Sequence, residues 1–176
     1  MPSAVVVRAR LPASLERLRR RLVGNAAEGV PAHLTLLHPF IEPASLDLPV
    51  RRRLAEVAAR HPAFDYRQVG MAEWPDAIYV AVEPAEPFAR LQRDLQATFP
   101  SWPIYGAGSD FEFVPHITIA DSDGKLERGV RAAPAWRALR SHRAASIDVI
   151  ATRPDGRWRL VWRITLGART PAGGRC

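Results

Sequence analysis

Two short segments of this chain repeat one pattern, and that pattern constrains both the fold and the site. Residues 33–36 read His-Leu-Thr-Leu and residues 116–119 read His-Ile-Thr-Ile, with 83 positions between the two histidines. In a β-strand, side chains two residues apart project from the same face. We therefore expect each segment to place a histidine and a threonine on one face of a strand and two aliphatic side chains on the other.

The surroundings of the two segments are also alike. Each lies in a predicted strand, which is followed by a possible helix and then by a predicted β-hairpin. In chain order these segments are the strand 33–40, the helix 47–60 and the hairpin strands 64–71 and 77–83, then the strand 113–120, the helix 125–140 and the hairpin strands 145–151 and 158–166. The repetition predicts two similar lobes that face each other.

The connections between strands indicate the fold class. Turns around Pro75-Asp76 and at residues 154–156 are too tight for anything but antiparallel pairing. A strand at 4–9 and amphipathic helices after Pro12 and at 87–99 complete the pattern, which predicts an α+β fold. We expect residues 1–170 to form a single domain and residues 171–176 a flexible tail.

The composition leaves the class of partner open. The chain has 25 Lys and Arg against 18 Asp and Glu, a net charge of +7, and a basic field concentrates anions such as nucleic acids or phosphorylated small molecules. However, all of these basic residues except Lys125 are arginine, which is equally typical of a codon bias. The arginine runs at 19–21 and 51–53 are accordingly interpreted as solvated helix faces first and phosphate-binding tracks second.

The compartment is inferred from what the sequence lacks. The one cysteine, Cys176, cannot form an internal disulfide. No apolar run approaches the roughly 18 residues of a spanning helix, and Arg8 and Arg10 follow too soon for a signal peptide. We expect a cytoplasmic protein that does not contact the membrane.

The two His-x-Thr segments are the candidate site. If their strands face one cleft, two imidazoles and two hydroxyls surround a single point. Imidazole donates or accepts a proton near neutral pH, and hydroxyls bind phosphate oxygens. Histidines on opposite sides of a phosphorus atom can supply the base and the acid of an in-line displacement without a metal. A single His-x-Thr is usually an idle surface pair, but two in the same setting favour the functional interpretation.

With these motifs the chain resembles the 2H phosphoesterases, a family that includes the bacterial RNA 2′,3′-cyclic phosphodiesterases once called 2′-5′ RNA ligases. The likeness covers residues 4–166, and its specific parts are the segments 33–40 and 115–120. It implies a bilobal α+β fold, with two pseudo-symmetric lobes of antiparallel sheet, helices on the outside and a central cleft. Residues 121–143 are less recognisable, and no particular basic phosphate ligand lies near the second motif.

The resemblance also implies the chemistry. The protein would open a 2′,3′-cyclic phosphate, or another 2′-linked phosphodiester, of an RNA end or a small nucleotide, and the reverse reaction would be a 2′-5′ ligation. We assign His116 as the base and His33 as the acid, with Thr35 and Thr118 holding the nonbridging oxygens. We expect that no metal or other cofactor takes part and that the protein is a monomer. Two alternatives stay open: a non-catalytic RNA- or nucleotide-binding module on the same fold, and a metal-dependent hydrolase.

Aromatic side chains are candidates for substrate binding because a nucleotide site needs a surface on which a base can stack. The candidates are Tyr105, Trp74, Tyr79 and Phe40. Tyr105, in a glycine-containing loop before the second motif, is the favoured one. For Phe40 the stronger alternative is ordinary packing in the core.

The other three histidines are given no role in the site. The odd offset of His38 from His33 predicts that it points to the other face of the strand. His61 is expected to be a solvated residue at a helix end, and His142 is expected on the surface in an arginine-rich turn. Substitution of any of these three is expected to leave turnover nearly unchanged.

Overall fold

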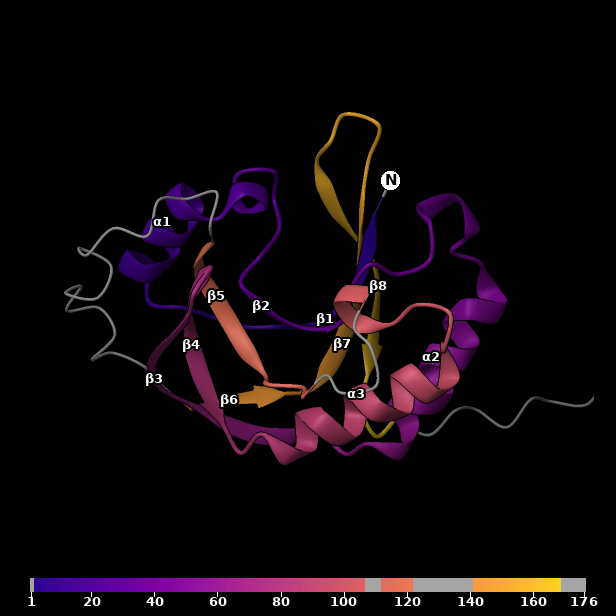
Figure 1. The fold of residues 1–176 in the computed structure, drawn as a ribbon. Coiled ribbons are helices and arrows are strands. Elements are labelled where there is room, and N and C mark those ends of the chain that lie inside the picture. The colour runs from indigo at the N-terminus through magenta and orange to yellow at the C-terminus, as the bar shows by residue number, and fades with distance from the viewer. Residues whose placement is uncertain (1, 107–111, 122–140, 169–176) are drawn as a thin grey trace, which may run out of the picture.

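The described part of the chain contains two four-stranded antiparallel sheets (Figure 1). The computed structural model describes residues 2–106, 112–121 and 141–168. Sheet A has the strand order β2 (His33–Leu37), β1 (Ser3–Arg8), β7 (Ser146–Thr152) and β8 (Trp158–Thr165). Sheet B has the order β5 (His116–Asp121), β4 (Ala77–Glu83), β3 (Phe64–Trp74) and β6 (Ser141–Ala144). The predicted α+β class is confirmed.

The two sheets are built in the same way, but their helices are exchanged. In each sheet an inner strand is joined through a helix to the edge strand beside it: β1–α1–β2 in sheet A and β4–α3–β5 in sheet B. Helix α1 (Ala13–Leu22) packs against β5 of the opposite sheet, and α3 (Glu86–Thr98) packs against β2 (Figure 1). The edge strands β2 and β5 are themselves in contact, so the exchange holds the two motif strands together.

The lobes are not consecutive halves of the sequence. Sheet A combines the first two strands of the chain with the last two described strands, and sheet B takes the four between them. The hairpin that follows each motif strand belongs to the opposite sheet: β3–β4 after β2, and β7–β8 after β5. The two lobes are therefore interleaved along the chain.

Local sequence explains where the helices begin and end. Helix α2 (Leu48–Arg60) is capped by Asp47, whose carboxylate accepts a hydrogen bond of 2.9 Å from the Val50 N–H. Helix α3 buries Phe88, Leu91 and Leu95 on one face and ends just before Pro100. Helix α2 contacts both α3 and β8, and the main hydrophobic core is continuous across these layers.

Sheet A has a second apolar surface on its other face. Val5 and Val7 of β1 and Val149 of β7 belong to the main core. Ala4, Val6 and Ile150 point the opposite way, where they form a separate small cluster with Val30, and Trp158 packs against it. This face of sheet A is thus apolar although it is not covered by the helices of the main core.

Several predicted boundaries differ from the observed ones. Strand β3 continues to Trp74, and β5 begins at His116 instead of at residue 113. Strand β6 was not predicted, because four residues reading Ser-His-Arg-Ala carry no apolar alternation. The predicted helix at 125–140 and the tail at 171–176 lie outside the described residues. Within the part of the chain that the structure describes, no helix has the length and apolarity that a membrane crossing requires.

Candidate active site

Both His-x-Thr segments have the predicted alternation of faces. In β2, His33 and Thr35 are half-buried while Leu34 and Leu36 are fully buried. Strand β5 has the same pattern: His116 and Thr118 are half-buried, and the two isoleucines between and after them are fully buried. The two histidines and the two threonines line one cavity of about 490 Å³.

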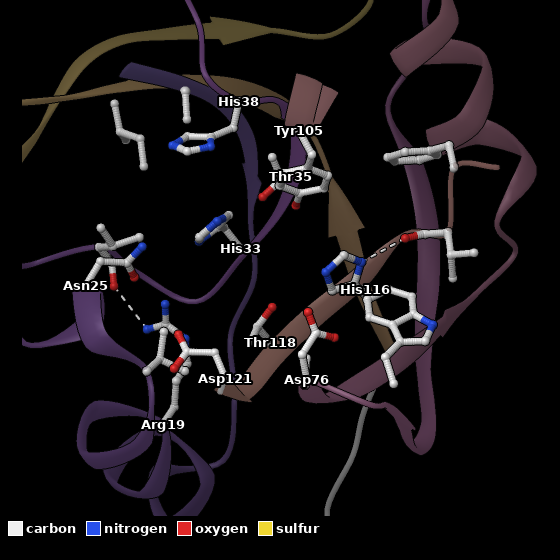
Figure 2. A pocket seen from close by; sticks show the side chains of 18 of the residues that line it. Arg19, Asn25, His33, Thr35, His38, Asp76, Tyr105, His116, Thr118 and Asp121 are labelled. Atoms are coloured by element: carbon white, nitrogen blue, oxygen red, sulfur yellow. Dashed lines mark hydrogen bonds between the residues drawn. The ribbon is translucent and has the colours of Figure 1, made fainter. Parts of the chain in front are cut away.

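The four side chains come from the facing edges of the two sheets. Figure 2 shows His33 and His116 on opposite sides of the cavity, with Thr35 and Thr118 between them. Besides burial, which has the largest effect, a positive charge on His116 lowers the pKa of His33. The two rings therefore interact electrostatically. The arrangement surrounds one point with two imidazoles and two hydroxyl groups.

The backbone fixes the tautomer of both histidines in the same way. His33 Nδ1 lies 2.7 Å from the carbonyl oxygen of Pro31, and His116 Nδ1 lies 2.8 Å from the carbonyl oxygen of Val114. A carbonyl oxygen only accepts, so each Nδ1 must carry the proton and donate it. In the neutral rings Nε2 is then the unprotonated nitrogen, available to accept a proton.

Burial favours the neutral form of both rings. It lowers the pKa of His33 to about 4, and the positive charge of Arg19 acts in the same direction, while the hydrogen bond to Pro31 opposes it. Burial also lowers the pKa of His116, against the opposing effect of its bond to Val114. A phosphate anion between the rings would oppose this preference, because a nearby opposite charge favours the protonated form.

Arg19 is buried in the cavity wall, so the interpretation of residues 19–21 as a solvated helix face is wrong for this residue. Its side chain is 2% exposed, and Nη1 donates to the carbonyl oxygen of Val30 at 3.0 Å and lies 3.7 Å from Glu16. Burial lowers the pKa of Arg19, and the carboxylates of Glu16 and Asp121 act in the opposite direction. Arg19 is buried because α1 packs on β5, which turns the helix face carrying Leu15 and Leu22 inward.

The positive charge of the chain is not gathered in the described cavity wall. Among the lining residues that the structure describes, Arg19 is the one arginine or lysine, whereas Asp76, Glu112 and Asp121 contribute carboxylates. Asp76 lies near Thr118 and His116 in Figure 2, at the sheet B end. Within the described ranges, no three His, Cys, Asp or Glu side chains come together as a possible metal site.

Two of the four predicted aromatic contacts line the cavity. Tyr105 does so, and its hydroxyl is hydrogen-bonded to Thr35. Trp74 does so beside His116, with ring centroids 4.6 Å apart. Tyr79 is buried behind Trp74 at 4.2 Å and does not reach the cavity.

Phe40 is a core residue, which corrects its place among the candidates for substrate binding. Its side chain is 4% exposed and lies 5.1 Å, centroid to centroid, from Phe99. The ring of Trp102 packs against it at 6.1 Å. These neighbours hold Phe40 away from the cavity, and it does not line it.

The prediction for His38 is wrong as well, since His38 lines the cavity together with His33. Strand β2 ends at Leu37, and both Leu36 and Leu37 are fully buried, so the alternation of faces stops before His38. Its ring lies 6.4 Å from those of Tyr105 and Trp158. An offset counted along a strand cannot place a residue beyond the strand's end.

The two remaining histidines lie outside the cavity but are not solvated as expected. His61, at the end of α2, places Nε2 2.9 Å from an oxygen of Asp94 on α3 and so links the two helices. His142 lies in β6, half-buried, with its ring 5.5 Å from that of Tyr66. Burial lowers the pKa of His142.

Asn25 and Trp158 are among the cavity residues that sequence reasoning missed. Asn25 lies in the 3-10 turn Gly24–Ala26, and Trp158 begins β8, more than a hundred residues later. In the sequence, neither residue belongs to a His-x-Thr segment or to any other motif that indicates a binding site. The fold alone brings them to the site.

The comparison with protein families gives a match over most of the chain. The model described as the 2′-5′ RNA ligase superfamily matches residues 7–153, which include both His-x-Thr segments. No curated protein matches.

Solved structures share the fold. TT0787 of Thermus thermophilus is 24% identical, with a TM-score of 0.60, over 97% of this chain and 100% of that one. LigT of E. coli, solved with 3′-AMP, is 17% identical with a TM-score of 0.55, over 94% of this chain and 97% of its own. A structure described as a phosphoesterase is 18% identical with a TM-score of 0.53, over 93% of this chain and 98% of that one. LigT has also been solved with NADP+ and with ATP.

Proposed function

Because the chain belongs to the 2′-5′ RNA ligase superfamily, we propose that it is a phosphodiesterase acting on a 2′,3′-cyclic phosphate, or another 2′-linked phosphodiester, of an RNA end or a nucleotide. His33, Thr35, His116 and Thr118 are the proposed catalytic residues, and no metal takes part. One observation carries the proposal: two His-Thr pairs on equivalent edge strands, with their Nδ1 atoms held alike, line one cavity.

The proposed reaction is an in-line displacement at phosphorus. Nε2 of one histidine takes a proton from a water molecule as the water oxygen bonds to phosphorus. The bond between phosphorus and a ribose oxygen breaks on the opposite side, and the protonated Nε2 of the other histidine gives its proton to that oxygen. The threonine hydroxyls donate hydrogen bonds to the nonbridging oxygens. With a ribose 5′-hydroxyl in place of water as the attacking group, the same steps break the bond from phosphorus to the 3′ oxygen of the cyclic phosphate and give a 2′-5′ linkage.

The surroundings of the two rings favour His33 as the base, the reverse of the assignment expected from the sequence. A general base must start neutral and a general acid must start protonated. His33 has the pKa lowered to about 4 and has the cation of Arg19 near it. Arg19 is not among the charges that act on the pKa of His116. His116 is therefore the better candidate for the proton donor.

Turnover of a nucleoside 2′,3′-cyclic phosphate in the presence of EDTA tests this proposal. The panel includes cyclic phosphates, 2′-5′-linked oligonucleotides and cyclic dinucleotides, with products identified by mass spectrometry. We expect hydrolysis of at least one 2′-linked substrate that survives the chelator and is lost in both His33→Ala and His116→Ala. Activity abolished by EDTA would instead indicate a metal-dependent hydrolase. Binding without turnover of any member of the panel would indicate a nucleotide- or RNA-binding module.

A further inference from the structure

The end of the cavity beside sheet A has a chemistry that phosphate transfer does not use. It is formed by Ala4, Val23, Val30, Ile150 and Trp158, with Asn25 at its rim. We propose that this end is a nucleobase subsite, in which Trp158 provides the stacking surface and Asn25 reads the base edge and selects adenine over guanine. The inference rests on the proposed function, because it assumes that the substrate is a nucleotide.

The apolar character of this end suits a flat heterocycle. Ala4 and Ile150 come from adjacent strands of sheet A, and Val30 lies beside them, each 3% exposed. Small and branched side chains form the floor, and the indole of Trp158 packs against the same cluster. Ligand sites are typically apolar, with a few polar groups that set orientation. A base placed here would be held largely by stacking and burial.

The subsite is held together before any ligand enters. The Trp158 N–H donates to the carbonyl oxygen of Glu28 at 2.9 Å, which fixes the start of β8 to the turn that carries Asn25. Gly29 makes this approach possible: its φ is +100°, and a Cβ there would meet the Trp158 carbonyl oxygen at 3.3 Å. The carbonyl oxygen of Asn25 accepts from Glu28 and Val30, so the turn is closed on itself. A preorganised site spends little binding energy on ordering.

The opposite end of the cavity is less suited to a base. The indole of Trp74 already packs against Tyr79 at 4.2 Å and against His116 at 4.6 Å. Asp76 lines the cavity there, near His116 and Thr118, so a base at this end would pack beside a carboxylate (Figure 2). Toward the end beside sheet A, the carboxylate that lines the cavity is that of Asp121, which lies next to the cation of Arg19, and Arg19 is hydrogen-bonded to Val30 (Figure 2).

Asn25 supplies the polar group that can distinguish bases. Its exposed side chain stands at the edge of the cavity, on the far side of His33 from His116 (Figure 2). A carboxamide offers one donor group and one acceptor, which match N7 and the N6 amino group of adenine. Guanine presents two acceptors, O6 and N7, on the same edge and leaves the carbonyl of Asn25 without a donor.

Kinetics on three substrates test the subsite. They are the 2′,3′-cyclic phosphates of adenosine and guanosine, and glycerol 1,2-cyclic phosphate as a substrate without a base. We expect Trp158→Leu to lower kcat/KM for adenosine relative to the base-free substrate by about 5- to 150-fold, the loss typical of one base stacked on an aromatic ring. Asn25→Ala should remove the preference for adenosine over guanosine. The kcat/KM of this variant for the base-free substrate is measured in the same experiment.

Trp162→Leu is the matched control for the tryptophan. It makes the same change on the same strand, but Trp162 packs against the main core on the other face of sheet A. Thermal unfolding of all three variants identifies those that have lost the fold. If Trp158→Leu lowers kcat/KM for all three substrates equally, Trp158 is a structural residue and the subsite is wrong. An unchanged adenosine-to-guanosine ratio in Asn25→Ala would overturn the role of Asn25.

A failure of the proposed function gives a different result. In that case the wild-type protein hydrolyses none of the three cyclic phosphates. Calorimetric titration with adenosine 3′-monophosphate and guanosine 3′-monophosphate then still tests the subsite. Tighter binding of the adenosine compound, lost in Trp158→Leu and retained in Trp162→Leu, would support it. Equal binding of both compounds to the wild-type protein would refute it.

Discussion

His33 and His116 each donate from Nδ1 to the carbonyl oxygen of the residue two positions earlier, over 2.7 Å and 2.8 Å. Each motif strand begins at its histidine, so the accepting carbonyl lies in the connection just before the strand. The same local geometry therefore orients both rings from opposite sides of the cavity. Neither ring can use Nδ1 for chemistry without losing this bond, which leaves Nε2 as the reactive atom of both.

Removing either imidazole should abolish most of the activity. His33→Ala and His116→Ala are each expected to lower kcat by about 10²–10⁴-fold on a 2′,3′-cyclic phosphate, the usual contribution of one general acid or base. His61→Ala is the control, because His61 lies outside the cavity and pairs with Asp94. Near-normal turnover by a folded His116→Ala variant would exclude a two-histidine mechanism.

A substrate with a better leaving group should separate the acid from the base. A nucleotide ester of nitrophenol releases a stable anion that needs no proton donor. On this ester His116→Ala is expected to keep a rate close to that of the wild-type protein, while His33→Ala stays slow. The opposite result would restore the assignment of His116 as base and His33 as acid.

The stability of the protein should fall in mildly acidic solution because of His33. Its pKa is lowered from 6.5 to about 4 in the folded protein, so the unfolded chain binds more protons between these values. The neutral His33 ring therefore contributes to the free energy of unfolding, by about 3 kcal/mol at most. This contribution is fully present above pH 6.5 and is lost as the pH falls to 4. Urea unfolding measured between about pH 7 and pH 4 should show a smaller loss in His33→Gln than in the wild-type protein.

His61→Gln is the control for that experiment, since it removes a histidine that does not line the cavity. Its free energy of unfolding should follow the wild-type pH dependence more closely than that of His33→Gln does. An identical slope in all three proteins would mean that burial of the His33 ring does not control the acid sensitivity.

Arg19 should control the protonation of His33 from the cavity wall. Its charge lowers the pKa of His33, so Arg19→Met is expected to raise that pKa. The measurement is a pH titration of the imidazole resonances by NMR. Arg20→Met is the matched control, because Arg20 is exposed and binds the same Glu16 at 3.5 Å without lining the cavity. An equal response to both substitutions would assign the effect to the helix as a whole.

The sequence was sufficient for the features that depend on local order. Period-two alternation placed His33, Thr35, His116 and Thr118 on the correct strand faces, because alternation is a property of the strand itself. The cap at Asp47 and the stop at Pro100 were equally local.

Features that depend on contacts between distant segments could not be predicted. Arg19 is buried only because α1 packs on a strand of the other sheet, and a helical pattern does not say which surface will cover it. Trp158 reaches the cavity through a hydrogen bond to Glu28, 130 positions away. His38 was misplaced because the end of β2 is set by the chain beyond it and not by its own alternation.

The exchange of α1 and α3 between the sheets has a mechanical consequence. Each helix is covalently tied to one lobe and packed on the other, so drawing the lobes apart would strip both helices from their partners at once. The distance between the two imidazoles is therefore set by the packing of the fold. Ligands must enter through the mouth of the cavity, and the two lobes should melt in a single cooperative transition.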